Sequence, residues 1–152
     1  MGIKKEPLKI YFACPILGAT QEDRDRYISI IDLLKKHGIV LTEFFADTKE
    51  IERKEKEMTD SSIFNRDIEL IKESTVVVAE ITEKSHGVGV ELGFSSGRKP
   101  ILCIRRHKED RISPMILGNQ HITLVHQYRE LEELEGIFDR FFNIQMFLHL
   151  RA

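Results

Sequence analysis

Short apolar runs alternate along the chain with segments whose apolar residues recur every three to four positions. The first run, residues 8–14 (LKIYFAC), is followed by apolar residues at helical spacing between Tyr27 and Leu34. A short apolar run predicts a strand, and the three-to-four spacing predicts one face of a helix. The chain therefore begins with a strand and then a helix, which Gly38 ends.

The same alternation continues to the carboxyl end. Residues 75–81 (TVVVAEI) predict the clearest buried strand, because they are nearly all apolar and rich in β-branched valine. We expect a charged loop at 47–57, a helix capped by Asp60 or Ser61, and a glycine-punctuated turn at 85–89. The expected strands are residues 8–14, 39–44, 75–81, 100–105 and 121–125, and the later helices are residues 61–73, 91–96 and 130–148.

Five strands that alternate with helices favour a parallel sheet covered on both faces. The 152 residues are the length of one ordinary domain, so we expect a single domain spanning 1–152. The predicted class is α/β, a three-layer flavodoxin-like or Rossmann-like fold with a five-stranded parallel sheet. Ligands of such folds bind where the strand order reverses, in the flavodoxin-like order between the first and third strands. Chemistry is therefore expected after Cys14 and after Ile81.

Composition and charge exclude several classes of protein. The 41% hydrophobic and 32% charged residues are typical of a soluble globular protein, and no apolar run approaches the ~20 residues that span a membrane. The net charge of -2 offers no footprint for a nucleic-acid polymer. The two cysteines form no CxxC pair, and the amino terminus lacks the apolar region of a signal peptide, so we expect a cytoplasmic protein.

Three well-known types of functional site are excluded, because the residues that each requires are missing. Cys14 follows the first strand as in CX5R tyrosine phosphatases, but Thr20 stands where the phosphate-binding arginine belongs. The glycines at 87, 89 and 93 miss the dinucleotide fingerprint by one residue, and no GxxxxGK occurs. The acidic cluster of a receiver domain is absent. None of the six histidines has a metal-ligand spacing, so the sequence predicts no metal site. The reaction inferred below needs no organic cofactor either, and we expect none.

Asp67 is a charged residue on the apolar side of its predicted helix. Ile63 lies four positions before it, and Leu70 and Ile71 lie three and four positions after it. A carboxylate on such a face must be compensated. It is either a helix-edge residue that pairs with Arg66 or a site carboxylate with a shifted pKa.

Glu91 and Tyr11 are the other candidates at the predicted strand-order reversal. Glu91 follows a glycine-rich turn and is expected to begin a helix, whose dipole would keep it ionised as a carboxylate nucleophile requires. Helix amino termini also attract acidic residues without any functional role. Tyr11 on the first strand could orient the carboxylate through its hydroxyl, or it could simply belong to the core.

At these residues the sequence resembles the nucleoside 2-deoxyribosyltransferase superfamily. It is most similar to the branch of Rcl-like 2'-deoxynucleoside 5'-monophosphate N-glycosidases, and the resemblance covers residues 8 to about 128. Several ordered blocks together make it specific. The matching segments are 10–16, 22–24, 40–43, 76–82, 87–93 and 112–116, with Asp67 and Ser85 between them.

The resemblance implies a role for each matching residue. Glu91 would attack C1' of the sugar, Tyr11 would orient Glu91, and Asp67 would assist near the sugar and the leaving base. Ser85 stands where the transferases carry an aspartate that contacts the free 5'-hydroxyl, and a neutral hydroxyl suits a 5'-phosphate. The remaining residues placed toward the substrate are Ile16, Leu17, Gly18, Phe44, Gly87, Gly89, Ser113 and Met115.

Two departures from the branch concern the base and the phosphate. Leu17 replaces an arginine of the first loop, and Phe44 replaces a histidine after the second strand. The resemblance therefore leaves the preferred base open. Because the first-loop arginine is missing, we expect backbone amides and serines to bind the phosphate.

The expected activity is hydrolysis of the N-glycosidic bond of a nucleoside 5'-monophosphate through a glycosyl-Glu91 intermediate. Transfer of the deoxyribosyl group to another base uses the same intermediate and is an alternative, as is a nucleotide-binding module without catalysis. We expect a homodimer with shared sites, because the family match places Ser113 in the partner's site. The aromatic residues of 138–148 would form the interface or, in the other interpretation, cover the monomer core.

Overall fold

A computed structural model describes residues 6–152, and its five strands form one sheet in the order β2-β1-β3-β4-β5. All four neighbouring pairs are parallel, which confirms the predicted α/β class. The strands are β1 (Lys9–Ala13), β2 (Ile39–Val40), β3 (Val76–Glu80), β4 (Ile101–Arg106) and β5 (Leu124–Tyr128). The helices are α1 (Gln21–Leu34), η1 (Glu43–Ala46), α2 (Thr48–Glu55), α3 (Asp60–Glu73), α4 (His86–Ser95), α5 (Pro114–Leu117) and α6 (Glu133–His149).

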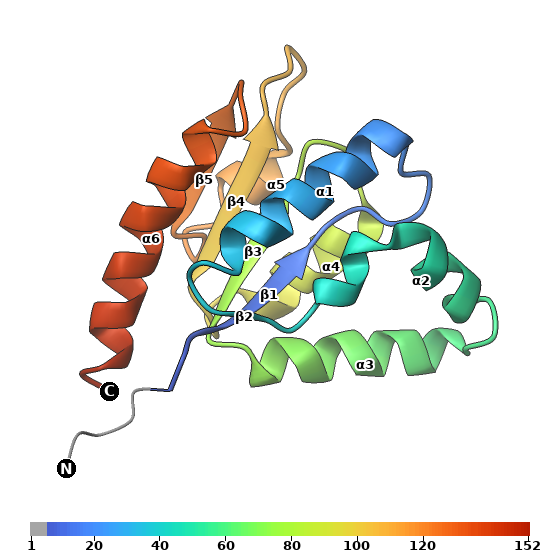
Figure 1. Cartoon of the computed structure of the whole chain (residues 1–152), viewed down its shortest axis with the longest axis horizontal. Coiled ribbons are helices and arrows are strands. Elements are labelled where there is room, and N and C mark those ends of the chain that lie inside the picture. Colours follow the sequence, from blue (N-terminus) through green and yellow to red (C-terminus); the bar gives the residue numbers. More distant parts are fainter. Residues whose placement is uncertain (1–5) are drawn as a thin grey trace.

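Helices cover both faces of the sheet and produce three layers (Figure 1). The helices α1 and α6 pack on one face, whereas α3 and α4 lie side by side on the other. The chain runs from β1 to β2 at one edge and then crosses back to β3 on the other side of β1. The strand order therefore reverses between β1 and β3, where folds of this kind bind ligands.

The central strands are buried on both sides, as the near-continuous apolar runs predict. All five residues of β3 are buried, and Tyr11 and Phe12 of β1 have no exposed surface. Burial of both faces explains why these strands lack the alternation of a half-exposed sheet. Tyr11 is thus fixed in the core with its side chain on the same side of the sheet as α4.

The prediction of a strand over residues 39–44 is wrong beyond Val40, where β2 ends. The hydroxyl of Thr42 donates to the carbonyl of Phe12 at 2.8 Å and accepts from the Phe12 amide at 2.9 Å. A side chain thus satisfies the β1 backbone where a longer β2 would have done so. The main chain is released to form the 3-10 helix η1.

The charged loop expected at 47–57 is also wrong, because most of it is α2. Asp47 caps this helix by accepting from the Glu50 amide at 3.0 Å, and Arg53 and Lys54 pair with Glu50 on its surface. Buried Ile51 attaches α2 to the core. The D-x-x-E pattern at 47–50 is a helix-start signal that the high charge of the segment concealed.

The turn expected at 85–89 is the first part of α4. The Ser85 hydroxyl accepts from the Val88 amide at 3.3 Å, and buried Val88 and Leu92 pack the helix on the core. This packing overrides the low helix propensity of glycine. Glu91 therefore lies in the second turn of α4, and its expected position at the start of a helix is wrong.

Three other boundaries differ from the predictions. Thr59, not Asp60 or Ser61, caps α3 by accepting from the Ser62 amide at 3.2 Å. The strand β5 begins at Leu124, because residues 119–122 form a turn in which Asn119 accepts from the His121 amide at 3.0 Å. The last helix begins at Glu133, whose carboxylate accepts the amides of residues 129 and 130 and holds that segment as a turn.

Candidate active site

A tyrosine and a glutamate from distant parts of the chain meet between β1 and α4. The Tyr11 hydroxyl of β1 donates a short hydrogen bond to Oε1 of Glu91. The core position of β1 and the packing of α4 fix the two side chains independently. The pairing of Tyr11 with Glu91 is therefore built into the fold.

The surroundings of Glu91 keep its carboxyl group from ionising easily. Burial raises the pKa of Glu91 to about 8, and the charge of Asp67 adds to this rise. The hydrogen bond from Tyr11 and the charge of Arg66 act in the opposite direction. The expectation that a helix dipole keeps this group ionised is thus wrong, since burial dominates and the helix begins earlier.

Asp67 on α3 has the features of both interpretations, a partner of Arg66 and a carboxylate with a shifted pKa. Its Oδ1 accepts from Nε of Arg66 at 2.8 Å, and its side chain is 18% exposed. Burial raises the pKa of Asp67, although the Arg66 guanidinium opposes the rise. Asp67 is therefore paired with Arg66 and also has a shifted pKa beside Glu91.

A cavity of about 300 Å³ opens over these carboxyl groups. Ser85 and Gly87 from the start of α4 form one part of its wall, and Phe45 and Glu55 form another. Its lining residues are Cys14, Ile16, Leu17, Phe45, Glu55, Ile63, Asp67, Lys84, Ser85, His86, Gly87, Val88 and Glu91. The predicted residues Ile16, Leu17, Asp67, Ser85, Gly87 and Glu91 are thus brought together.

A second cavity of about 400 Å³ adjoins the first. Ser113 and Gly89 line it, and the two cavities share Lys84, Ser85 and Val88. Arg105 and Arg111 are also in its wall. Two serines and several cations of one chain therefore lie beside the first cavity.

Three predicted substrate residues lie outside both cavities. Gly18 lines a neighbouring depression and adopts a left-handed φ of 76° that suits glycine. The Phe44 ring lies 5.3 Å from the Arg66 guanidinium and is 37% exposed. Met115 is 83% exposed on α5. None of these three residues lines the cavity that contains Glu91.

Sequence reasoning missed Glu55 and Lys84, and it named Arg66 only as a possible partner of Asp67. Arg66 bridges Glu55 and Asp67, and Lys84 precedes the Ser85 cap. Glu55 and Arg66 meet only because α2, which was expected to be a loop, packs against α3. Lys84 could have been predicted from the sequence, because it is a cation that directly precedes Ser85, the expected phosphate contact.

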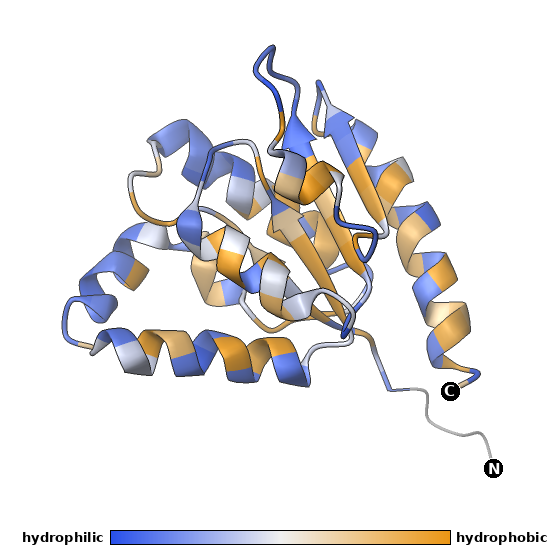
Figure 2. Ribbon diagram, turned by 180° about the vertical axis from the view of Figure 1, so that it is seen from behind, coloured by the Kyte–Doolittle hydropathy of each residue, from blue (hydrophilic) through white to orange (hydrophobic). Residues whose placement is uncertain are grey.

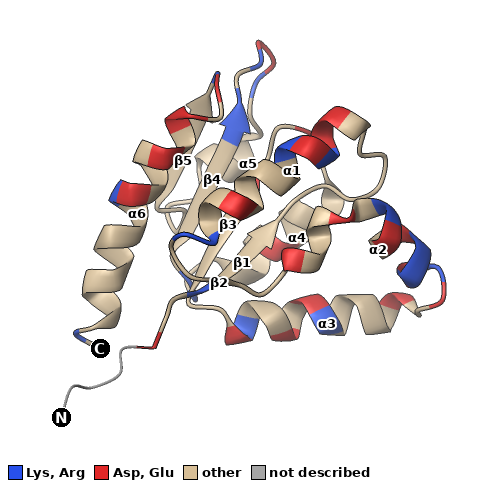
Figure 3. Cartoon of the chain, viewed as in Figure 1, with Lys and Arg blue, Asp and Glu red and all other residues tan. Residues whose placement is uncertain are grey.

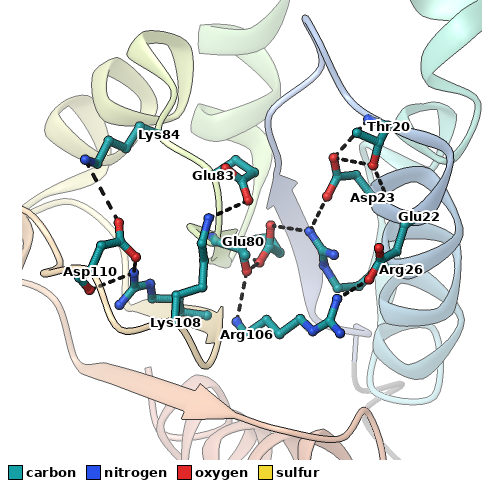
Figure 4. A network of polar contacts seen from close by, with 12 residues as sticks. Thr20, Glu22, Asp23, Arg26, Glu80, Glu83, Lys84, Arg106, Lys108 and Asp110 are labelled. Atoms are coloured by element: carbon teal, nitrogen blue, oxygen red, sulfur yellow. Dashed lines mark hydrogen bonds and ion pairs between the residues drawn. The ribbon is translucent and has the colours of Figure 1, made fainter.

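A network of ion pairs stands at the same carboxyl edge of the sheet (Figure 4). Glu80, at the end of β3, is fully buried and lies 3.8 Å from Arg26 of α1, which in turn holds Asp23 at 2.7 Å. Glu80 also accepts from the hydroxyl and amide of Thr82. The segment that leads from β3 to Ser85 is therefore anchored at its beginning.

Charge is distributed unevenly around the site (Figure 3). Acidic and basic residues gather on α2 and at the carboxyl end of β4, whereas α4 carries Glu91 as its one Asp, Glu, Lys or Arg. Within residues 6–152 no group of three or more His, Cys, Asp or Glu side chains is arranged to hold a metal ion. Across the same residues, no helix is long and apolar enough to cross a membrane.

Comparison with known proteins identifies the family of this chain. Residues 10–131 match the family model described as nucleoside 2-deoxyribosyltransferase. The chain belongs to this family. It is 40% identical over 141 residues to the 5-hydroxymethyl-dUMP N-hydrolase of Esox lucius, covering 89% of this chain and 96% of that protein. It is 39% identical over 142 residues to the protein of the same name from Mus musculus, covering 90% and 80%.

A solved structure supports the fold of this family member. The CMP N-glycosidase of Clostridium botulinum superposes with a TM-score of 0.59 at 20% identity, covering 88% of this chain and 98% of that one. The three-layer arrangement predicted from the sequence is thus shared with that protein.

Proposed function

We propose that the protein hydrolyses the N-glycosidic bond of (deoxy)nucleoside 5'-monophosphates. The observation that carries the proposal is the hydrogen bond from buried Tyr11 to Glu91, which itself lines a cavity where the strand order reverses. The names of the relatives support the same reaction, since they are N-hydrolases of a deoxynucleotide. The products would be the free base and the sugar 5-phosphate.

Glu91 acts as the nucleophile in this proposal. Its ionised carboxylate forms a bond to C1' while the bond from C1' to the base nitrogen breaks, and the base leaves with that electron pair and is protonated. Water then attacks C1' and gives up a proton, and the ester oxygen returns to Glu91 as carboxylate. Tyr11 holds the carboxylate in place, and Asp67 faces the sugar and the leaving base.

The test is incubation with deoxynucleosides, deoxynucleotides and ribonucleotides, with free base measured by chromatography. Glu91→Gln should remain folded and lose at least about a thousandfold in kcat/KM, because only positioning and electrostatics remain. Glu109→Gln makes the same chemical change on a side chain that is 99% exposed, and should not alter turnover. Near-normal turnover by folded Glu91→Gln would reject the mechanism.

Transfer to a second base is the other candidate, favoured by the family description. The same glycosyl-Glu91 ester serves both reactions, which differ only in whether water or a base attacks it. Adding a second base to the incubation separates them, because transfer yields a new nucleotide. Binding of nucleotides with no turnover under any condition would instead indicate a binding module.

The 5'-phosphate is proposed to lie at the start of α4. Ser85 caps this helix and faces both cavities, and free amides of a helix amino terminus attract anions. Lys84, 88% exposed and lining both cavities, supplies a cation in a chain that has Leu17 in place of the first-loop arginine. Ser113 faces the same region.

A 5'-monophosphate should therefore improve kcat/KM over the matching nucleoside by at least tenfold, about 1.4 kcal/mol. Ser85→Asp should reduce this preference, because its carboxylate would repel the phosphate dianion. Lys84→Ala should reduce it by loss of attraction, whereas Lys49→Ala on exposed α2 should not. A better rate with the unphosphorylated nucleoside would reassign the chain to the transferase type.

A homodimer completes the proposal, with α4 and α5 at its interface. Apolar and small residues cover the exposed side of α4, where Val90 is 53% exposed and a Cβ added at Gly89 or Gly93 would meet no atom within 4 Å. Figure 2 shows α4 and α5 in front of the sheet, and both carry hydrophobic stretches. An exposed apolar helix face is normally covered by a partner, so a second copy is the expected cover.

The compartment is proposed to be the cytoplasm. Cys14 and Cys103 are buried and form no disulfide in the described residues. Burial raises the pKa of both thiols, so neither is a ready nucleophile. Thiols in this state suit a reducing environment.

A further inference from the structure

Three buried charged residues take no part in the proposed reaction. The exposed fractions of Asp23, Arg26 and Glu80 are 8%, 7% and 0%, and none of them lines the cavity that contains Glu91. Moving a charged group out of water costs several kcal/mol even inside a protein, and apolar residues of similar size are often as stable in its place. Stability alone therefore does not explain why these three residues are charged.

Arg26 links the two carboxylates. Its Nη2 donates to Oδ1 of Asp23 at 2.7 Å, and the same nitrogen lies 3.8 Å from Oε2 of Glu80 (Figure 4). Asp23 and Arg26 belong to α1, whereas Glu80 is the last residue of β3. The guanidinium therefore connects the first half of α1 with the end of the central strand.

Each carboxylate also binds the main chain of a loop. Oδ2 of Asp23 accepts from the amide of Thr20 at 2.9 Å and from its hydroxyl at 2.8 Å. Oε1 of Glu80 accepts from the amide of Thr82 at 3.1 Å and from its hydroxyl. The contacts thus form one continuous series, the polar chain, made of Thr20, Asp23, Arg26, Glu80 and Thr82.

The polar chain connects two loops that form walls of the cavity. The first loop, residues 14–20, follows β1 and ends at Thr20, and the second loop, residues 81–85, follows β3 and contains Thr82. The relative position of these loops therefore depends on the polar chain. Their residues that line the cavity of Glu91 are Cys14, Ile16, Leu17, Lys84 and Ser85.

We propose that Arg26 and Glu80 are positioning residues for the 5'-phosphate. Through Thr82 they hold the second loop so that Ser85 meets the phosphate while C1' lies at Glu91. This inference rests on the proposed function, in which the phosphate lies at Ser85. Neither positioning residue touches the substrate, so both act only through the loop that they hold.

The reacting carboxylate is fixed by contacts outside the polar chain. Buried Val88 and Leu92 pack α4 on the core, and buried Tyr11 donates to Glu91 from β1. Loss of the polar chain should therefore raise KM for the nucleotide and leave kcat nearly unchanged. The matching nucleoside should be affected little, because it has no phosphate.

The test compares two substitutions of Thr82 on a nucleotide and its nucleoside. The substrates are 5-hydroxymethyl-dUMP, which the names of the relatives contain, and 5-hydroxymethyl-2'-deoxyuridine. Thr82→Val keeps the shape of the side chain but removes its hydroxyl, whereas Thr82→Ser keeps the hydroxyl. Thr82→Val should lower the nucleotide-to-nucleoside ratio of kcat/KM at least about fivefold through KM, and Thr82→Ser should keep it within about twofold of the wild-type ratio.

This ratio does not respond to a merely structural defect, because a smaller folded fraction lowers both rates equally. Thr48→Val is the matched control. Thr48 is also buried, its hydroxyl has no hydrogen-bond partner among residues 6–152, and it does not line the cavity. The same chemical change at this position should leave the ratio at its wild-type value.

A double variant tests Arg26 and Glu80 directly. It is needed because the Thr82 hydroxyl also accepts from the amide of Arg106 at 2.9 Å, a contact that Thr82→Val removes. Arg26→Met combined with Glu80→Met removes the buried ion pair without leaving either charge alone, and such replacements are often neutral for stability. The folded double variant should lower the ratio as Thr82→Val does.

Three results would overturn the proposal. The first is a wild-type ratio in Thr82→Val, and the second is a wild-type ratio in the folded double variant. The third is a loss of the ratio in Thr82→Ser as large as that in Thr82→Val, because the hydroxyl would then not be responsible.

Equilibrium binding separates this inference from the proposed function. If no nucleotide is cleaved, calorimetric titration of the wild-type protein and Thr82→Val with the same nucleotide and nucleoside still tests the polar chain. Weaker binding of the nucleotide, but not of the nucleoside, by Thr82→Val supports the inference even though hydrolysis has failed. Unchanged binding of the nucleotide by Thr82→Val rejects it.

Discussion

Glu91 is a carboxyl group whose charge is set by three neighbours and by burial. Its pKa of about 8 makes the protonated form dominant at neutral pH in the free protein. The proposed nucleophile is the ionised form, whose fraction increases about tenfold per pH unit below that pKa. The activity of the protein should therefore depend on pH in a way that reports on Glu91.

The value of kcat/KM should rise with pH and level off above about 8, because this quantity reports the ionisation of the free enzyme. Tyr11→Phe removes a hydrogen bond that lowers the pKa of Glu91, so its midpoint should move to higher pH. Asp67→Asn removes a negative charge that raises this pKa, so its midpoint should move to lower pH.

Measurement between pH 6.5 and 9.5 keeps the substrate phosphate mostly dianionic, since its second pKa is about 6. The two variants serve as controls for each other, because both alter the site but act on Glu91 with opposite sign. A wild-type profile that falls through pH 8, or two midpoints that move together, would contradict the role of Glu91.

The sequence predicted Tyr11, Asp67 and Glu91 because each stands out within its own segment or in a matching block. It did not predict Glu55 or the bridging role of Arg66. Their importance comes from a contact between α2 and α3, and one of these helices was expected to be a loop. Pairing across elements leaves no periodic signal in a single segment.

Among the elements, the long apolar runs were predicted well and the short or charged ones were not. The strands β1, β3 and β4 are fixed by burial on both faces, which composition reveals directly. The strand β2 is ended by the side chain of Thr42, and α2 begins at the Asp47 cap. These are individual hydrogen bonds, so a pattern averaged over many residues misses them.

The connection from α1 to β2 depends on a close approach that only glycine permits. A Cβ at Gly38 would lie 2.3 Å from the carbonyl oxygen of Leu8, which also accepts from the Ile39 amide at 2.8 Å. Gly38→Ala should therefore lower the free energy of unfolding by about 1–3 kcal/mol. The urea midpoint of the folded protein measures this change.

Gly136→Ala is the control for Gly38→Ala. Gly136 lies in α6, and its added Cβ would have the Arg140 guanidinium at 3.8 Å, an ordinary contact. Alanine is the better helix former, so this variant should gain up to about 1 kcal/mol. A Gly38→Ala protein as stable as the wild type would show that β1 can move to accept a side chain.

For the whole molecule, the aromatic residues of α6 turn out to serve mainly the monomer. Phe138, Phe141 and Phe142 are buried in the core. For these three residues, the interpretation that the aromatic side chains cover the monomer core is confirmed. Phe147 at the end of α6 is 54% exposed. The surface of the proposed dimer is therefore better sought on α4 and α5, where Val90 and Leu117 are exposed.

Two substitutions distinguish these surfaces. Val90→Glu should convert the proposed dimer into a monomer, because it places a charge in the proposed interface of α4. Phe147→Glu makes a comparable change on α6 and should leave the dimer intact. Sedimentation at micromolar concentration measures both, and the reverse result would move the interface to α6.

Mixing of two inactive variants then tests whether the dimer shares its sites. Glu91→Gln lacks the nucleophile, and Ser113→Asp should repel the phosphate. If Ser113 acts in the partner's site, one site of the mixed dimer contains both wild-type residues, since a symmetric interface repeats each contact twice. Activity should then recover to about half of the wild-type value, because one of the two sites is intact.

The alternative is that Ser113 contributes to the site of its own chain. Within one chain Ser113 already lies in the cavity that adjoins Ser85, so this alternative predicts no recovery. Absence of recovery after verified subunit exchange would thus place Ser113 in the site of its own chain.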